Sequence, residues 1–409
     1  MGANASLRRV LWVVGPGLMV MLADTDAGSV ITASQSGARW GLRLLALQVV
    51  LVPVLYLVME LTVRLGIGTG KGFAGLVRER FGARWAYLLV VALLVSVVGA
   101  LVTEFAGIAG AGELYGIPRG ITVPAAAGLL VLLVVSGGYR RVEVVGITLG
   151  LFELTFVGAA VFAHPSMHAL ASGVTAGQPL GNRSYLGLVA ANVGAVVMPW
   201  MLFYQQGAVV DKGLRPQHLR LARIDTAVGA LLTQVVMAAV LVATAVSLGG
   251  RHGGHSLSSI GQISAALTPL LGSSASRLVL ALGMLGAAFV AGIVVSLAAA
   301  WAVSEAAGRP GSLNARVSRA PLFYAIFVAA VAVGATAVLV SNSLVHLAID
   351  VEIVNALLLP LVLGMLVALA RSALPRAYRL GRPRLVTVGF VTSGATLLCI
   401  LWLGLAFGF

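Results

Sequence analysis

The chain has 409 residues, of which 59% are hydrophobic and only 10% are charged, and its mean hydropathy is +1.02. Soluble domains carry about 25% charged and about 45–50% apolar residues, so the composition excludes a soluble fold and predicts an integral membrane protein. The formal net charge of +14 comes from short basic clusters between long apolar runs. That pattern is typical of loops facing anionic lipid head groups and argues against a nucleic-acid partner.

Eleven apolar stretches are long enough to cross a bilayer, whose core is about 30 Å thick and needs about 20 residues per helix. Helices are expected because unpaired backbone groups are costly in lipid. We therefore predict an all-α membrane protein with a single transmembrane domain, residues 1–409. Its spans, in chain order, are 10–36, 42–66, 86–113, 120–137, 143–163, 184–206, 225–249, 277–305, 321–341, 347–371 and 386–408.

Basic residues are distributed unevenly over the predicted loops. With the N-terminus in the cytoplasm, 20 of the 27 Lys and Arg residues fall in cytoplasmic segments, six fall outside and Arg64 lies in a span. Cytoplasmic loops of membrane proteins carry such an excess. We expect a multi-pass protein of the cytoplasmic membrane with its N-terminus inside.

The first and sixth spans contain residues that interrupt a helix. Asp24, Asp26 and Gly28 lie in the middle of the first, and Met198-Pro199 lies in the middle of the sixth. Proline removes a helical hydrogen bond and glycine tolerates unwinding. Broken segments at corresponding positions of two halves indicate a transporter site. We therefore predict two five-helix inverted repeats, 1–165 and 184–371, followed by an extra helix at 386–408.

Acidic residues inside the apolar spans are the main candidates for a binding site. One charge at a helix centre costs roughly 2.5–3.5 kcal/mol on insertion scales, so Asp24 and Asp26 together suggest a function. Residues i and i+2 face different sides of an intact helix, and only unwinding lets both address one site. The alternative for Asp24 is a protonated group bonded to a neighbouring helix. A structural role near span ends, within reach of water, is expected for the acids Glu60, Glu113, Glu153, Glu305 and Asp350.

Met198 is the second informative residue. A lone methionine in an apolar helix is ordinarily packing, but this one precedes a proline in a broken span. Carboxylate, hydroxyl and carbonyl oxygens with one thioether would form a moderately soft site that favours Mn²⁺ or Fe²⁺ over Ca²⁺.

These motifs resemble those of the Nramp family of divalent-metal transporters. The family's first helix carries Gly-Pro-Gly and then Asp-Pro-Gly-Asn, and here GPG at 15–17 precedes DAGS at 26–29. Its sixth helix carries Ala-x-x-Met-Pro-His, and AVVMPW runs from 195 to 200. The segment ELTVRLGIGTGKGFAGLVRERFG at 60–82 is similar to its Leu-Gly-x-x-Thr-Gly-Lys stretch, and TEFAGIAGAGELYGIP at 103–118 to its third helix. The resemblance implies a LeuT-like architecture with helices 1 and 6 broken.

The resemblance also implies a ligand set for the metal. Asp26 would be the carboxylate ligand, Met198 the thioether ligand and Ala195 a backbone-carbonyl ligand. Ser29 stands where the family has a ligating Asn. Asp24 and Glu352 are further candidates for metal binding or access, Glu352 because it falls where the family's tenth helix has a Gln.

Several positions depart from the family pattern. Ala27 replaces its Pro, and Trp200 and Gln205 stand where it has two His residues. Glu104 replaces the third-helix Asp of its proton route, and Gly107 replaces the Glu one turn on. Titratable groups that proton coupling would use are therefore missing, and we expect weak or absent coupling, with Glu104 as the one remaining candidate for a proton route.

The sequence thus predicts a secondary-active or facilitated transporter of Mn²⁺ or Fe²⁺. A Mg²⁺ transporter of an Nramp-related type is the alternative, because Mg²⁺ keeps several waters and needs few carboxylates. An amino-acid or organic-substrate transporter on the same fold is less favoured, because two aspartates would repel a substrate carboxylate. No cofactor, enzymatic activity or obligate protein partner is expected. The RHGGH segment at 251–255 is interpreted as a solvated loop, and Walker, GxSxG and HExxH patterns are absent.

Overall fold

The computed structural model describes residues 12–248, 257, 259–341, 344–379 and 381, together with residues 386, 387, 389, 390, 393, 394 and 397. All regular elements in these ranges are helices, as predicted. The α-helices are α2 (Pro16–Asp24), α3 (Ala27–Trp40), α4 (Leu45–Thr69), α5 (Phe73–Phe81), α6 (Ala83–Glu113), α7 (Arg119–Ser136), α8 (Tyr139–Gly150), α9 (Leu154–Phe162), α10 (Met167–Thr175), α11 (Arg183–Val196), α12 (Pro199–Asp211), α13 (Leu219–Ser247), α14 (Ile260–Leu271), α15 (Ser273–Ala307), α16 (Pro321–Val340) and α17 (Leu344–Ser372). Short 3₁₀ helices are η1 (Gly41–Leu44), η2 (Leu151–Glu153), η3 (Pro216–His218) and η4 (Arg376–Tyr378).

Most of the predicted spans coincide with these helices. Nine helical stretches within the described residues are long and apolar enough to cross a membrane, and one of them, Ala27–Thr69, joins α3 to α4. Helices occupy the places of the first ten predicted spans. The predicted span at 386–408 and the RHGGH segment lie largely or wholly outside the described residues, so the count of eleven stays a prediction.

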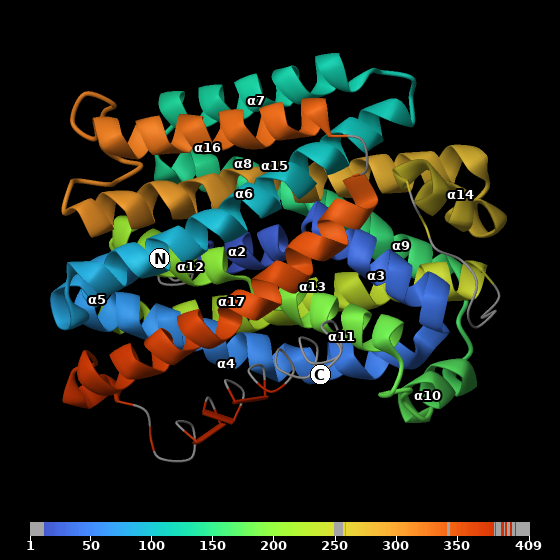
Figure 1. The fold of residues 1–409 in the computed structure, drawn as a ribbon, viewed down its shortest axis with the longest axis horizontal. Helices are drawn as coiled ribbons and strands as arrows, with labels where there is room; N and C mark the ends of the chain where they lie inside the picture. The colour runs from blue at the N-terminus through green and yellow to red at the C-terminus, as the bar shows by residue number, and fades with distance from the viewer. Residues whose placement is uncertain are drawn as a thin grey trace, which may run out of the picture.

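The long helices run roughly along one direction, with the two broken helices in the middle of the bundle (Figure 1). The helices α7 and α16 lie side by side at one edge, and the orange-red α17 crosses the face of the bundle in this view. The short helix α5 lies at one end, and α10 and α14 lie at the other. The apolar residues around the two helix breaks belong to one large buried cluster, to which nearly all of the spans contribute side chains.

A carboxylate from α13 holds the start of α2. Asp225 Oδ2 accepts the backbone N–H groups of Gly15 at 3.1 Å and Gly17 at 2.7 Å, and its Oδ1 accepts that of Leu18 at 3.2 Å. The first N–H groups of a helix have no partner within the helix, and a carboxylate there also favours the helix dipole. Asp225 therefore fixes the position of α2 against α13.

Hydrogen bonds join the broken helices at the opposite end as well. The Asn192 side chain on α11 donates to Ser36 on α3 at 2.8 Å and accepts from Gln48 on α4 at 2.7 Å. Gln35 on α3 exchanges two hydrogen bonds with the backbone of Leu257. Both ends of the central helices are thus tied to their neighbours, and the region of the breaks is enclosed.

Candidate metal site

The first broken helix is interrupted where the sequence predicts it. The helix α2 ends at Asp24, Thr25 has a non-helical conformation, and α3 begins at Ala27 with Asp26 as its N-cap. Asp26 Oδ1 accepts the backbone N–H of Ser29 at 2.6 Å, whereas its Oδ2 is buried and has no hydrogen-bond partner. One oxygen of Asp26 therefore caps a helix, which is a common role of aspartate, and the other is available to a cation.

The sixth predicted span is broken at Met198. The helix α11 ends at Val196, and Met198 has an extended backbone (φ −94°, ψ 143°) and precedes α12, whose first residue is Pro199. The break leaves carbonyl groups at the end of α11 without helical partners. The carbonyl of Ala195 is one of these, and it accepts the hydroxyl proton of Ser29 at 3.0 Å. Three of the four predicted ligands, Asp26, Ser29 and Ala195, thus lie together where the two breaks meet.

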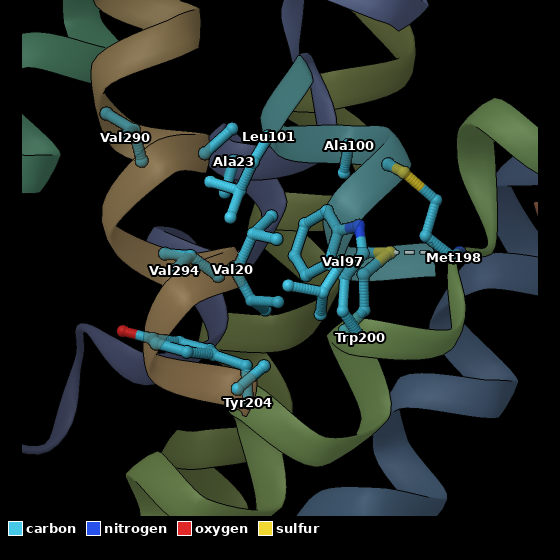
Figure 2. Close-up of a cluster of buried hydrophobic side chains, with 14 of the residues drawn as sticks. Val20, Ala23, Val97, Ala100, Leu101, Met198, Trp200, Tyr204, Val290 and Val294 are labelled. Carbon is cyan, nitrogen blue, oxygen red and sulfur yellow. Dashed lines mark hydrogen bonds between the residues drawn. The ribbon is translucent and has the colours of Figure 1, made fainter. Parts of the chain in front are cut away.

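The Met198 side chain is fully buried in the apolar cluster beside the breaks. Figure 2 shows it among the side chains of Val97, Ala100 and Trp200, and its backbone N–H points to the sulfur of Met201 at 3.4 Å. Its position at the break agrees with the prediction. In this structure its thioether packs against apolar neighbours, so its role as a ligand stays a prediction.

Glu352 of α17 lies directly against the first break. A Cβ atom on Gly28 would collide with Glu352 Oε1 and would lie 3.4 Å from both Asp26 Oδ1 and Thr103 Oγ1. Oε1 has no hydrogen-bond partner, whereas Oε2 accepts from Asn355 at 3.0 Å. A second carboxylate with a free oxygen therefore approaches Asp26, and the absence of a side chain at Gly28 makes the approach possible.

Glu104 of α6 contacts the first break from another side. Its Oε2 accepts the backbone N–H of Ala27 at 3.2 Å. A proline at position 27 has no N–H, so the departure from the family motif at this residue is what allows the bond. Gly107, one turn away, packs on the same residue, because a Cβ at Gly107 would lie 2.5 Å from the Ala27 Cβ. The contact leaves no space for an acidic side chain at position 107.

The two residues that replace the family's histidines have different surroundings. Trp200 is fully buried in the apolar cluster (Figure 2), and its indole N–H has no hydrogen-bond partner. Gln205 connects two helices, because its amide donates to Thr226 at 2.9 Å and accepts from Thr62 at 3.1 Å. Neither side chain is titratable near neutral pH. Gln205 on α12 links α4 to α13 through its two hydrogen bonds.

Asp24 faces away from these groups. Its Oδ2 accepts from Thr233 of α13 at 3.2 Å, and its Oδ1 is buried without a partner. The structure therefore places Asp24 and Asp26 toward different helices, although the helix is interrupted between them; the bond from Thr233 corresponds to the alternative of an Asp24 bonded to a neighbouring helix.

Glu153 is placed differently from the prediction. It was expected near a span end, but it lies within the fifth span, at η2, where α8 passes into α9. It is fully buried, and neither carboxylate oxygen has a hydrogen-bond partner. Residue 153 is the midpoint of the span predicted at 143–163, and Gly150 directly precedes the 3₁₀ turn, so the span itself was the signal for a buried acid. Glu305 does have the expected structural role, because it accepts the backbone N–H of Gly75 at 3.1 Å.

Charge at the breaks is strongly unbalanced. Five carboxyl groups with at most 1% exposure surround them, and none forms an ion pair in the described part of the chain: Asp24, Asp26, Glu104, Glu153 and Glu352. In the described part of the chain, no three His, Cys, Asp or Glu side chains lie close enough together to bind one metal ion by themselves. A buried charge needs a partner, so this region favours the binding of cations. The possible ligands at the breaks include a hydroxyl and a backbone carbonyl as well as carboxylates.

Comparison with known proteins decides the family. A model of the natural resistance-associated macrophage protein-like family, Nramp, matches residues 17–405. The chain belongs to the Nramp family. Similar curated Nramp relatives include the divalent metal cation transporter MntH of Brucella suis, 28% identical over 69% of this chain, and that of Listeria welshimeri, 28% identical over 69%. The aligned parts span 64% and 65% of these relatives' own lengths, which is less than two thirds.

Two solved structures share the fold. The manganese transporter of Eremococcus coleocola has a TM-score of 0.77 at 19% identity, covering 98% of this chain and 87% of that one. Mhp1, a nucleobase-cation-symport-1 family transporter, has a TM-score of 0.61 at 15% identity, covering 95% and 90%. These similarities confirm the all-helical, LeuT-like Nramp architecture of a multi-pass membrane protein.

Proposed function

We propose that this Nramp protein transports divalent metal ions across the membrane by alternating access, with Mn²⁺ and Fe²⁺ favoured. The relatives named as divalent metal cation transporters and the manganese transporter with the same fold support this proposal. The cargo is the metal ion itself, so no resident cofactor and no chemical step is assigned to the chain.

One observation carries the proposal. A free oxygen of Asp26 lies at the first break, and the Ser29 hydroxyl and Ala195 carbonyl meet where the second break adjoins it. These are three oxygen donors of different kinds, contributed by the two helices that the fold interrupts. We infer that they form the centre of the metal site, with Met198 completing the set when the ion is bound.

Metal binding to the purified protein tests this proposal without requiring transport. We expect Mn²⁺ to bind to the wild-type chain and Asp26→Ala to abolish binding. Asp350→Ala is the matched control, because Asp350 is an exposed acid on α17 and its removal should leave binding unchanged. Equal Mn²⁺ binding by both variants would contradict the assigned site.

A Mg²⁺ transporter is the second candidate, and two observations favour it. Glu352 adds a second carboxylate beside Asp26, and the Met198 thioether packs among apolar side chains. Mg²⁺ prefers oxygen ligands and retains waters. Competition of Mg²⁺ against Mn²⁺ separates the candidates, because a site that uses the thioether prefers Mn²⁺. An organic substrate is less supported, since the buried acids would repel its carboxylate.

We further propose that the chain is one transport domain of the cytoplasmic membrane with a cytoplasmic N-terminus, without an obligate protein partner. The asymmetric distribution of Lys and Arg supports this orientation. The inverted repeats 1–165 and 184–371 agree with breaks in the first and sixth spans. Proton coupling is proposed to be weak, because Glu104 bonds to a backbone N–H and Trp200 and Gln205 replace titratable groups.

A further inference from the structure

A second polar cluster lies at the first break, facing different helices from the metal site. It comprises Asp24 and Thr25 at the end of α2, Thr233 on α13 and Glu153 at η2; we call it the Asp24–Glu153 cluster. The hydroxyls of Thr25 and Thr233 are 2.6 Å apart, and Thr233 donates to Asp24 at 3.2 Å. The Thr25 side chain approaches Glu153, and Asp24 and Asp26 are near enough to interact with it electrostatically.

Three carboxylate oxygens of this cluster accept no hydrogen bond of normal geometry. They are both oxygens of Glu153, which is 0% exposed, and Oδ1 of Asp24, which is 1% exposed. No ion pair reaches either residue from the described part of the chain. An unpaired buried charge is strongly destabilising, and orphaned polar atoms in a native interior require an explanation such as a bound ion.

The cluster offers a uniform set of donors. Two carboxylates and two hydroxyls supply only oxygen atoms, whereas the metal site adds a thioether beside its break. Hard cations bind to oxygen ligands of this kind. Residues 24 and 26 are close in the chain, so ions at the two sites would repel each other, and this repulsion is halved when one of them is monovalent.

We propose that the Asp24–Glu153 cluster binds a small monovalent cation, Na⁺, at a site separate from that of the divalent metal. Given the proposed transport function, Na⁺ is then a candidate coupling ion. Its ligands Asp24 and Thr25 are at the same break as Asp26, so binding at one site changes the conformation available to the other. Such coupling is reciprocal in binding free energy.

Binding of ²²Na⁺ to the purified full-length protein, without divalent metal present, tests the inference. Glu153→Gln removes one charge and Thr233→Val removes one hydroxyl at similar size. We expect each variant to lower Na⁺ affinity, with Glu153→Gln lowering it about tenfold or more, equivalent to about 1.4 kcal/mol. Mn²⁺ binding should remain in both, since neither side chain belongs to the metal site.

Matched controls are Glu79→Gln and Thr148→Val. Glu79 is an exposed acid of α5, and the Thr148 hydroxyl on α8 is exposed and donates to the carbonyl of Val144. Both control variants should bind Na⁺ like the wild type. If Asp26→Ala loses Mn²⁺ binding but still binds Na⁺, the two ions bind at separate sites.

Two results would overturn the inference. One is a wild-type protein that binds no Na⁺ at saturating concentration while binding Mn²⁺, which means that protons alone neutralise the cluster. The other is Na⁺ binding that neither Glu153→Gln nor Thr233→Val weakens; if Glu153→Gln does not fold, Thr233→Val decides alone. Wild-type protein that binds Na⁺ but not Mn²⁺ would instead contradict the proposed metal transport and support the cation site.

Discussion

At the scale of single residues, the two oxygens of Asp26 have separate tasks. Oδ1 accepts the Ser29 N–H and fixes the first turn of α3, and Oδ2 is left without a partner. A helix N-terminus favours a carboxylate at its N-cap, so this position suits Asp26 both as a cap and as a ligand. Substitution of Asp26 therefore removes both a ligand and a helix cap, and stability must be measured alongside transport.

Met198 is expected to discriminate among ions rather than to set overall affinity. A thioether contributes little to binding of Mg²⁺ but interacts with Mn²⁺ and Cd²⁺. Met198→Ala should therefore weaken competition by Cd²⁺ and Mn²⁺ more than competition by Mg²⁺ in an uptake assay. If all three ions lose affinity equally, Met198 is a packing residue of the apolar cluster in Figure 2.

Glu104 is expected to act as a cap for α3 rather than as a proton carrier. Glutamine retains a carbonyl oxygen that can accept the Ala27 N–H now bound at 3.2 Å. Glu104→Gln should therefore transport metal at a rate similar to that of the wild type, measured as initial uptake into proteoliposomes. Acidification of the lumen that tracks metal entry in the wild type, and disappears in this variant, would show a proton route through Glu104.

At the scale of elements, the breaks depend on close crossings between helices. A Cβ on Gly194 of α11 would collide with the backbone oxygen of Glu352 and would lie 2.9 Å from the backbone nitrogen of Ala356 on α17. Backbone atoms cannot move aside as a flexible side chain can. The position of Glu352 against Gly28 thus depends on the small size of the residue at 194.

Gly194→Ala is expected to lower thermal stability and metal affinity together. Overpacking of a well-packed interior costs about 1–3 kcal/mol, and the displaced α17 carries Glu352 away from Asp26. Gly128→Ala on α7 is the matched control, because a Cβ there meets no atom within 4 Å and alanine favours a helix. Thermal unfolding of both variants in detergent checks this, and an unchanged Gly194→Ala midpoint would contradict the close crossing.

The sequence predicted the elements better than their contacts. Apolar runs located the spans, and Pro199 marked the second break, because proline acts on the backbone locally. The first break lies at Thr25, whereas Gly28 is helical within α3 and instead admits Glu352. The burial of Glu153 could have been predicted, because the residue lies at the centre of the predicted span 143–163; its neighbours on other helices could not. The bond from Ala27 to Glu104, and the approach of Glu352 to Gly28, join residues 77 and 324 positions apart, so only the packed structure reveals them.

At the scale of the whole molecule, alternating access requires the central helices to separate from the neighbouring helices at one end of the bundle. Asp225 ties α2 to α13 through three backbone N–H groups, and Lys212 adds bonds to the Val14 carbonyl at 3.0 Å and to Glu143 at 2.7 Å. These contacts hold together the end of the molecule at which α2 begins. Opening at this end must break them.

Asp225→Ala is expected to favour the state open at this end. Each hydrogen bond to a charged group contributes about 1.5–3 kcal/mol, so the loss of three should shift the equilibrium at least about tenfold. A cysteine at Met21, which is 1% exposed on α2, in a Cys399→Ser background should react faster with a water-soluble thiol reagent when Asp225 is replaced. An unchanged reaction rate, with Asp350→Ala as control, would show that Asp225 does not hold the closed state.

The most direct test of the central claim is metal uptake into proteoliposomes that contain a pH-sensitive dye, comparing Mn²⁺ with Mg²⁺. We expect the wild type to accumulate Mn²⁺ with little acidification of the lumen. Asp26→Ala should abolish uptake while inserting normally, and Asp24→Ala should have a milder effect. Near-normal Mn²⁺ uptake by Asp26→Ala would contradict the account, and complete loss only in Asp24→Ala would move the primary ligand to the other side of the break.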